Sequence, residues 1–217
     1  MADRDLLTLT MSAEHRWMEG WLEGPTFEGS PLQRGARAPE IEVIAGNGTA
    51  TPITSFWRAT PALVMLWRHL GCGCGLDRNG RLQEELPVYE EAGLRVAIVA
   101  PGDIERVNHY RDKHEVPVAM YATPDYAAHR AFGLGHWSME QVLYDAPEEF
   151  CDLRADTGKE FRTSRREKGR PLVDDPWMQA AEFVIDPEGW IRVAYYYNYC
   201  EDYPDPRIFI TAARLIA

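Results

Sequence analysis

Two continuously apolar segments separated by a helical pattern constrain the fold of this chain most strongly. Residues Ala62–Trp67 carry six apolar side chains in a row, and Leu94–Ala100 is a second apolar run interrupted by one arginine. Between them, Asp77–Glu91 has helical spacing, with Pro87 expected to kink the helix. Strands buried on both faces have continuous apolar sequences, and parallel strands need a helical crossover. We therefore predict a parallel βαβ unit over residues 62–100.

The C-terminal part predicts a β-hairpin that extends the same sheet. Glu182–Ile185 and Ile191–Tyr196 flank Asp186-Pro187-Glu188-Gly189, a sequence typical of a turn. The other predicted elements are an edge strand at Ile41–Ile44, a helix from Asp103 to His114, a strand at Val118–Tyr121, and helices at Tyr126–Phe132 and Pro206–Ile216.

Two segments depart from this alternation. Residues 1–36 form a predicted N-terminal extension, in which Met11–Leu22 is an apolar-faced helix that packs on the domain or forms a homodimer contact. Residues 37–217 form the main domain. Within it, Gly135–Ala180 is a long polar insert, and connections of this length are usually functional or mobile. We expect the insert to border the functional site and to limit access to it.

Charge and composition exclude two classes of partner. The formal net charge is −11, which argues against nucleic-acid binding, because phosphate recognition depends on lysine and arginine. The longest apolar run, Pro61–Trp67, is far shorter than the roughly 20 residues that span a membrane. The N-terminal residues show no secretory signal. We therefore expect a cytoplasmic protein, in which cysteines are more often reactive, metal-binding or buried than crosslinked.

Five short segments carry a family resemblance. They are Gly35–Glu40, Leu66–Cys72, Val99–Asp103, Ala131–Leu134 and Phe183–Gly189. In this order and spacing they resemble the thioredoxin-like superfamily, and within it the peroxiredoxin-like branch of alkyl hydroperoxide reductases and thiol-specific antioxidant proteins. The resemblance implies an α/β thioredoxin-like fold, here with an N-terminal extension and a long insert before the C-terminal β-hairpin. It also implies thiol-dependent redox chemistry.

In that family a cysteine follows the central strand and begins a helix, and Cys72 occupies this position. The N–H groups and dipole of a helix N-terminus favour the thiolate, which is the form that attacks a peroxide or a disulfide. Arg68 lies just upstream and is expected to stabilise the thiolate. The resemblance therefore implies Cys72 as the nucleophile, with Cys74 or Cys200 as the resolving thiol.

The predicted topology brings Cys200 to the same place. Cys200 follows the last predicted strand, which runs parallel to the strand before Cys72, so both carboxyl ends lie at one edge of the sheet. We expect Cys200 to lie near Cys72 and Cys74. A Cys72–Cys74 disulfide would close a small, strained ring, which favours Cys200 as the partner. The alternative is a small buried side chain without a chemical role.

The chain departs from the family pattern at three places. One residue, rather than two, separates Cys72 from Cys74, His69 stands where peroxiredoxins have threonine or serine, and no proline directly precedes the strand at Phe183. His69 and His136 are candidates to approach the site, and His69 to add positive charge near the sulfur, but both are interpreted as structural, and Cys151 as a bystander.

Three hypotheses therefore stay open. The first is a cofactor-free oxidoreductase that acts on a peroxide, a disulfide or a small thiol. The second is a binding protein that holds zinc, copper or an iron–sulfur cluster with Cys72, Cys74 and Cys200. The third is a redox-inactive interaction module.

Overall fold

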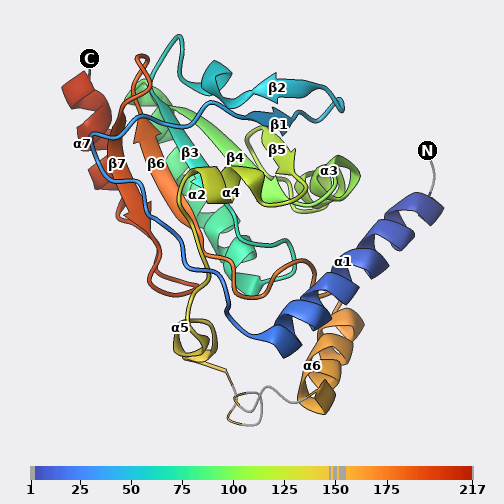
Figure 1. Cartoon of the computed structure of the whole chain (residues 1–217). Helices are drawn as coiled ribbons and strands as arrows, with labels where there is room; N and C mark the ends of the chain where they lie inside the picture. The colour runs from blue at the N-terminus through green and yellow to red at the C-terminus, as the bar shows by residue number, and fades with distance from the viewer. Residues whose placement is uncertain (1–2, 147, 149–150, 152–154, 217) are drawn as a thin grey trace.

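The computed structural model describes residues 3–146, 148, 151 and 155–216, and a mixed β-sheet forms its centre (Figure 1). In the described part of the chain, seven strands pair in the order β2-β1-β5-β4-β3-β6-β7. The strands are β1 Glu42–Ile44, β2 Ala50–Pro52, β3 Ala62–Leu66, β4 Arg95–Pro101, β5 Met120–Thr123, β6 Ala181–Ile185 and β7 Ile191–Tyr196. The helices are α1 Asp3–Glu23, α2 Gly73–Glu91, α3 Ile104–Lys113, α4 Ala127–Ala131, α5 Met139–Leu143, α6 Ala155–Glu167 and α7 Pro206–Ile216, with a 3₁₀ turn η1 at Ile53–Phe56.

The predicted βαβ unit and hairpin are confirmed. Strand β3 pairs in parallel with β4, from Ala62 opposite Arg95 to Leu66 opposite Val99, and α2 forms the crossover. The hairpin β6–β7 belongs to the same sheet, because β6 pairs antiparallel with β3 and β7 pairs antiparallel with β6. Strands β3 and β7 therefore run in the same direction, so their carboxyl ends lie at one edge. This is the arrangement on which the convergence of Cys72 and Cys200 depends.

The prediction that residues 41–44 form an edge strand is wrong. Strand β1 lies between β2 and β5, and the edge is formed by β2, which the sequence pattern did not reveal. Gly48 adopts a φ of 81° in the turn between them, and this conformation folds the chain back as a hairpin. The three residues Ala50–Pro52 are too few to show a period of two, which is why β2 was not predicted.

Helices cover both faces of the sheet (Figure 1). On one face α2, α3 and α7 pack their apolar side chains on the strands, as Leu82, Val107 and Phe209 illustrate. On the other face, Phe132, which directly follows α4, and Phe56 of the 3₁₀ turn belong to a second cluster. Every residue of β3 is buried, as expected for a strand covered on both faces.

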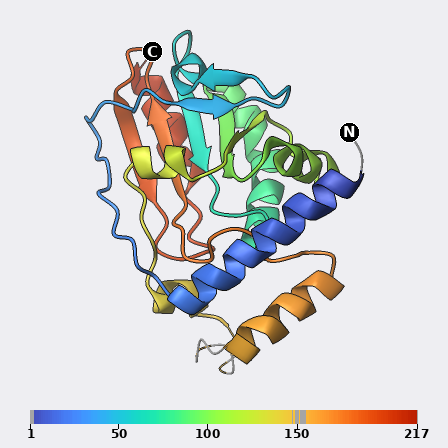
Figure 2. The same ribbon diagram turned by 45° about the vertical axis from the view of Figure 1, so that its right-hand side comes forward.

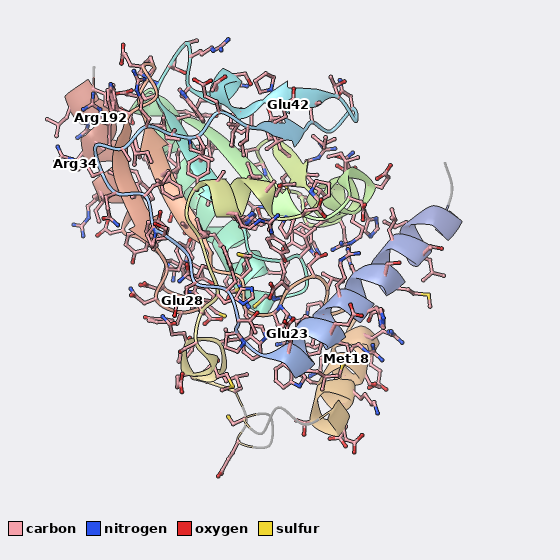
Figure 3. The ribbon with its side chains drawn as sticks, viewed as in Figure 1. Met18, Glu23, Glu28, Arg34, Glu42 and Arg192 are labelled. Carbon is pink, nitrogen blue, oxygen red and sulfur yellow. The ribbon has the colours of Figure 1, made fainter. Side chains whose placement is uncertain are left out.

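The N-terminal helix packs against the insert. Helix α1 is longer than the predicted Met11–Leu22. It lies beside α6, past the C-terminal end of β3 (Figure 2). Met18 lies where the two helices meet (Figure 3), and a Cβ added at Gly158 of α6 would lie 2.9 Å from its Cε atom. Trp21 stacks on Trp177, with ring centroids 5.7 Å apart. The helices α5 and α6 were not predicted, because α5 has five residues and α6 is mostly polar.

No helix in the described part of the chain has both the length and the apolar character needed to cross a membrane.

Candidate functional site

The site begins where β3 ends and α2 starts. Cys72 is the N-cap residue of α2, in an extended conformation with φ −80° and ψ 144°, and its side chain is half-buried. Cys74 lies two residues further along, within the first turn of the helix, and is 6% exposed. The first backbone N–H groups of a helix have no partner within the helix, so they favour negative charge at Cys72. The position predicted for the reactive cysteine is thus the one that the helix polarises most.

Three sulfur atoms meet at this helix N-terminus. The Sγ atoms of Cys72, Cys74 and Cys200 all lie within 4.8 Å of one another. The loop after β7 carries Cys200, and two bonds hold its first residue: Tyr197 donates its N–H to Ala180, and the indole of Trp137 donates to the Tyr197 carbonyl at 2.7 Å. The predicted proximity of the three cysteines is confirmed.

Arg68 provides the positive charge of the cluster. Its Nη1 lies 3.0 Å from Sγ of Cys200 and 3.9 Å from Sγ of Cys72. The guanidinium donates to the carbonyls of Met178 and Pro176, and its Cζ lies 5.1 Å from the centroid of the Trp137 ring. Burial by itself would lower the pKa of Arg68, but the neighbouring sulfurs raise it, so the side chain stays charged. Arg68 is where the sequence predicted it, but it is nearer to Cys200 than to Cys72.

The thiols of the cluster share their protons unequally. Hydrogen bonds from Cys200 and Cys74 lower the pKa of Cys72 well below its ordinary value, against the opposing effect of burial. The same bond to Cys72 raises the pKa of Cys200 to about 12, and the pKa of Cys74 is raised as well. Arg68 alone would favour charge on Cys200, to which it is closer. Cys72 holds the charge because two thiols donate to it and because it lies at the N-terminus of α2.

His69 belongs to the site, although its position in the sequence indicated a structural role. Its Nδ1 accepts a hydrogen bond from the backbone N–H of Gly71 at 3.0 Å. The neutral ring therefore carries its proton on Nε2, and His69 hydrogen-bonds to Cys72, which further lowers the thiol's pKa. Burial and the charge of Arg68 lower the pKa of His69 itself, so the ring is neutral at pH 7.

A cavity of about 240 Å³ opens onto all three sulfur atoms. One wall is formed by Cys72, Cys74, Cys200, Arg68 and His69. The insert supplies much of the opposite wall, with the lining residues Val142, Leu143, Asp145, Ala146, Phe161, Arg165, Leu172 and Pro176. The predicted location of the insert beside the site is confirmed, and its effect on access stays a prediction.

A buried ion-pair network lies next to Cys74 and Cys200. Arg78 of α2 donates to both carboxylate oxygens of Glu182, at 2.7 and 3.1 Å, and to Glu85 at 2.8 Å. Tyr197, in the loop that carries Cys200, donates its hydroxyl to Glu182 at 2.5 Å. The network was not predicted, although a signal was present. Glu182 is an isolated charge in an otherwise apolar strand, and such a residue needs a partner.

Two other predicted residues lie away from the sulfur atoms. His136 bridges the carboxylate of Asp175, at 2.7 Å, and the backbone N–H of Thr26, at 3.0 Å, as its structural interpretation implied. Cys151 is exposed and is not part of the sulfur cluster.

The lowered pKa of Cys72 predicts an unusual pH profile of alkylation. A thiol reacts as its thiolate, so the rate of iodoacetamide labelling falls only when the pH drops below the pKa. We expect Cys72 to label at neutral pH with little change on going to alkaline pH, and Cys74 and Cys200 to label only in alkaline solution. Peptide mapping after labelling across the pH range measures this. Labelling of Cys72 only above about pH 8, or of Cys200 first, would contradict the assignment.

Comparison with known proteins agrees with this geometry at the level of the fold. A peroxiredoxin-like protein from Aquifex aeolicus matches with a TM-score of 0.59 and 13% identity, over 89% of this chain and 92% of that one. The peroxidoxin BcpB from Mycobacterium tuberculosis gives 0.58 and 10%, over 86% and 99%. A thiol peroxidase from Chromobacterium violaceum gives 0.54 and 14%, over 84% and 86%. The chain has the thioredoxin-like fold.

Sequence comparison places the chain in a family. It is 28% identical over 91 residues to the thioredoxin-like protein AAED1, chloroplastic, from Arabidopsis thaliana, which corresponds to 42% of this chain and 37% of that protein. The chain thus spans little more than a third of that relative's length. The profile of the AhpC/TSA antioxidant enzymes matches residues 81–199, a segment that excludes all three clustered cysteines. The match covers more than half of the sequence, and the chain belongs to the AhpC/TSA antioxidant enzyme family.

Proposed function

We propose that the protein is a thiol-dependent oxidoreductase that reduces peroxides through Cys72. The observation that carries the proposal is the sulfur cluster itself: three Sγ atoms within 4.8 Å, beside a buried guanidinium, at the N-terminus of a 19-residue helix. Membership of an antioxidant enzyme family supports it. The hydrogen bonds that lower the pKa of Cys72 supply the thiolate that the chemistry needs.

In the first step the Cys72 thiolate attacks the hydroxyl oxygen of the peroxide. A sulfur–oxygen bond forms, the oxygen–oxygen bond breaks, and the leaving oxygen takes a proton from solvent. The products are a Cys72 sulfenic acid and an alcohol or water, so the sulfur loses two electrons and the peroxide gains them. Arg68 lies beside the sulfurs and stabilises the negative charge that moves onto the leaving oxygen.

In the second step Cys200 resolves the sulfenic acid. Its thiol attacks the sulfur of Cys72, a disulfide forms, and the hydroxyl leaves with the thiol proton as water. Cys200 is preferred over Cys74, because a disulfide across one intervening glycine is strained. Arg68, 3.0 Å from Cys200, favours the thiolate of the attacking residue as its proton leaves. A thiol reductant then restores both cysteines.

The same geometry supports a second candidate function, the binding of a soft metal ion. Three cysteine sulfurs this close together would provide a thiolate set for zinc or copper(I). The guanidinium of Arg68 places a positive charge beside such an ion, which makes this the second choice. An iron–sulfur cluster commonly takes four cysteines, and Cys151 is exposed outside the group.

Replacing Cys200 with serine separates these functions. For the peroxidase we expect the wild type to lose two thiols reversibly with one equivalent of peroxide. In Cys200→Ser a disulfide can form only with Cys74, and we expect it at least about tenfold more slowly. A sulfenic acid at Cys72 should therefore accumulate, and dimedone traps it. For the metal site we expect about one ion per chain, lost in the variant. Thiol titration and metal analysis on protein purified without oxygen measure both. Unchanged disulfide formation and metal content would contradict a shared site.

Two further expectations also stay predictions. The AAED1 relative is named as chloroplastic, and an enzyme whose cysteines are regenerated by a thiol fits a reducing compartment such as the cytoplasm. The second expectation is a homodimer in which α1 contacts a second copy of the chain.

A further inference from the structure

A second cavity borders Cys72 from another side. It has a volume of about 210 Å³ and lies between α1, α3 and the end of the insert. Of the three clustered cysteines, Cys72 alone lines it, whereas all three line the cavity of about 240 Å³. Its remaining lining residues are Leu6, Thr10, Leu70, Gly71, Leu76, Arg106, His109, Tyr110, Lys113, His114, Gly169, Arg170, Pro171 and Val173. A molecule in this cavity therefore borders Cys72 and neither of the other two cysteines.

The cavity is cationic in a chain of net charge −11. None of its described lining residues is acidic. Arg106 is neutralised by two hydrogen bonds to Asp174, at 2.9 and 2.6 Å, and burial lowers the pKa of His114, so that ring is uncharged at pH 7. Lys113 and Arg170 remain as net positive charges. A Cβ added at Gly73 would lie 3.6 Å from Nη1 of Arg170, which puts that guanidinium at the first residue of α2, next to Cys72.

Tyr110, one of the lining residues, carries a buried hydroxyl. Tyr110 lines the cavity and is 6% exposed, and its hydroxyl makes no hydrogen bond within the described part of the chain. A Cβ added at Gly75 would lie 3.2 Å from this hydroxyl, so it faces the first turn of α2. Because Gly75 does not line the cavity, the part of Tyr110 that borders it is the ring and not the hydroxyl.

We propose that this cavity binds a small thiol carrying a carboxylate, and that this thiol is the reductant that regenerates oxidised Cys72. The inference rests on the proposed function and names its second substrate. A thiolate opens a disulfide by approaching along the sulfur–sulfur axis, opposite the sulfur that leaves. Cys200 faces the other cavity, so the side of Cys72 open to a thiol is the cationic one. The carboxylate is placed by Arg170 and Lys113.

The chemistry balances with two thiol molecules. The first thiolate attacks Cys72 of the Cys72–Cys200 disulfide, forms a mixed disulfide with Cys72, and releases Cys200, which takes a proton. A second thiolate attacks the thiol-derived sulfur of the mixed disulfide and releases the Cys72 thiolate. The two reductant molecules leave as their disulfide, having supplied the two electrons that the protein disulfide accepts.

Two matched pairs of probes test the inference. Iodoacetate and iodoacetamide differ in charge and hardly in size, and their labelling of reduced Cys72 needs no peroxide chemistry. Mercaptoacetate and mercaptoacetamide form the second pair, and their rates of reducing the oxidised protein compare an anionic thiol with a neutral one. Each experiment compares the wild type with Arg170→Gln, Lys113→Gln/Arg170→Gln and Lys159→Gln. The last removes an exposed charge of α6 outside the cavity, and a small uncharged thiol in solution gives the intrinsic ratio of the two reagents.

We expect the anionic-to-neutral rate ratio at Cys72 to fall about fivefold in Arg170→Gln and further in the double variant, and to stay unchanged in Lys159→Gln. Added salt should lower the wild-type ratio. An equal ratio in the wild type and Arg170→Gln would overturn the inference and leave the proposed function intact. A charge-dependent ratio without peroxide oxidation of Cys72 would keep the anion site and overturn the proposed function. A Cys72 that reacts with none of the probes would contradict both.

Discussion

Replacing Cys72 with serine is expected to lower the rate of peroxide reduction by a factor of about 10³ or more. A serine hydroxyl is neutral at the pH where Cys72 is a thiolate, and no helix N-terminus lowers its pKa enough to change this. Cys74 and Cys200 do not substitute for Cys72, because neither occupies the N-cap position of α2: Cys74 lies inside the helix and Cys200 in the loop after β7. Consumption of hydrogen peroxide in the presence of a thiol reductant measures the effect.

Cys151→Ser is the matched control for this prediction. Cys151 is exposed and lies outside the sulfur cluster, so its loss removes the same chemical group without touching the site. We expect wild-type rates from Cys151→Ser, and a folded protein by circular dichroism from both variants. Peroxide consumption by Cys72→Ser within a few-fold of the wild type would assign the nucleophile to another residue.

Replacing Glu182 with alanine is expected to lower the free energy of unfolding by about 3–5 kcal/mol. The side chains of Glu182 and Arg78 are 2% and 3% exposed, and their two hydrogen bonds lie in the core beside Cys74 and Cys200. Removing the carboxylate leaves the guanidinium with Glu85 alone, and it leaves the Tyr197 hydroxyl without its acceptor. Denaturant unfolding, with tryptophan fluorescence as the signal, measures the loss.

The double replacement Arg78→Met/Glu182→Leu tests whether the loss comes from an unpaired charge. When both ions are replaced by apolar side chains of similar volume, neither position 78 nor position 182 carries an unpaired charge, and Glu85 keeps the hydrogen bond from the Tyr89 hydroxyl, so part of the stability is expected to return. A loss below about 1 kcal/mol in Glu182→Ala would show that water reaches the pair. A double variant less stable than the sum of the single ones would contradict the account.

The sequence by itself determined the sheet at the centre of the fold and the place where its cysteines meet. The apolar runs before Cys72 and at Leu94–Ala100 indicate strands that are buried on both faces of the sheet. The turn sequence at Asp186–Gly189 indicates a hairpin. Chain direction then follows from connection lengths, because a helical crossover implies parallel strands and a tight turn implies antiparallel ones. The convergence of Cys200 on Cys72 is a consequence of these local patterns.

What surrounds those sulfurs was decided only by the tertiary structure. The carbonyls of Met178 and Pro176 that hold Arg68 lie more than 100 residues along the chain, and Trp137 comes from a segment without a periodic signal. The partner of Glu182 is likewise 104 residues away. Periodicity reports which face of an element is buried, but which side chains meet across elements depends on how the elements pack. The two cavities at Cys72 arise from that packing, and so do the charges that line them.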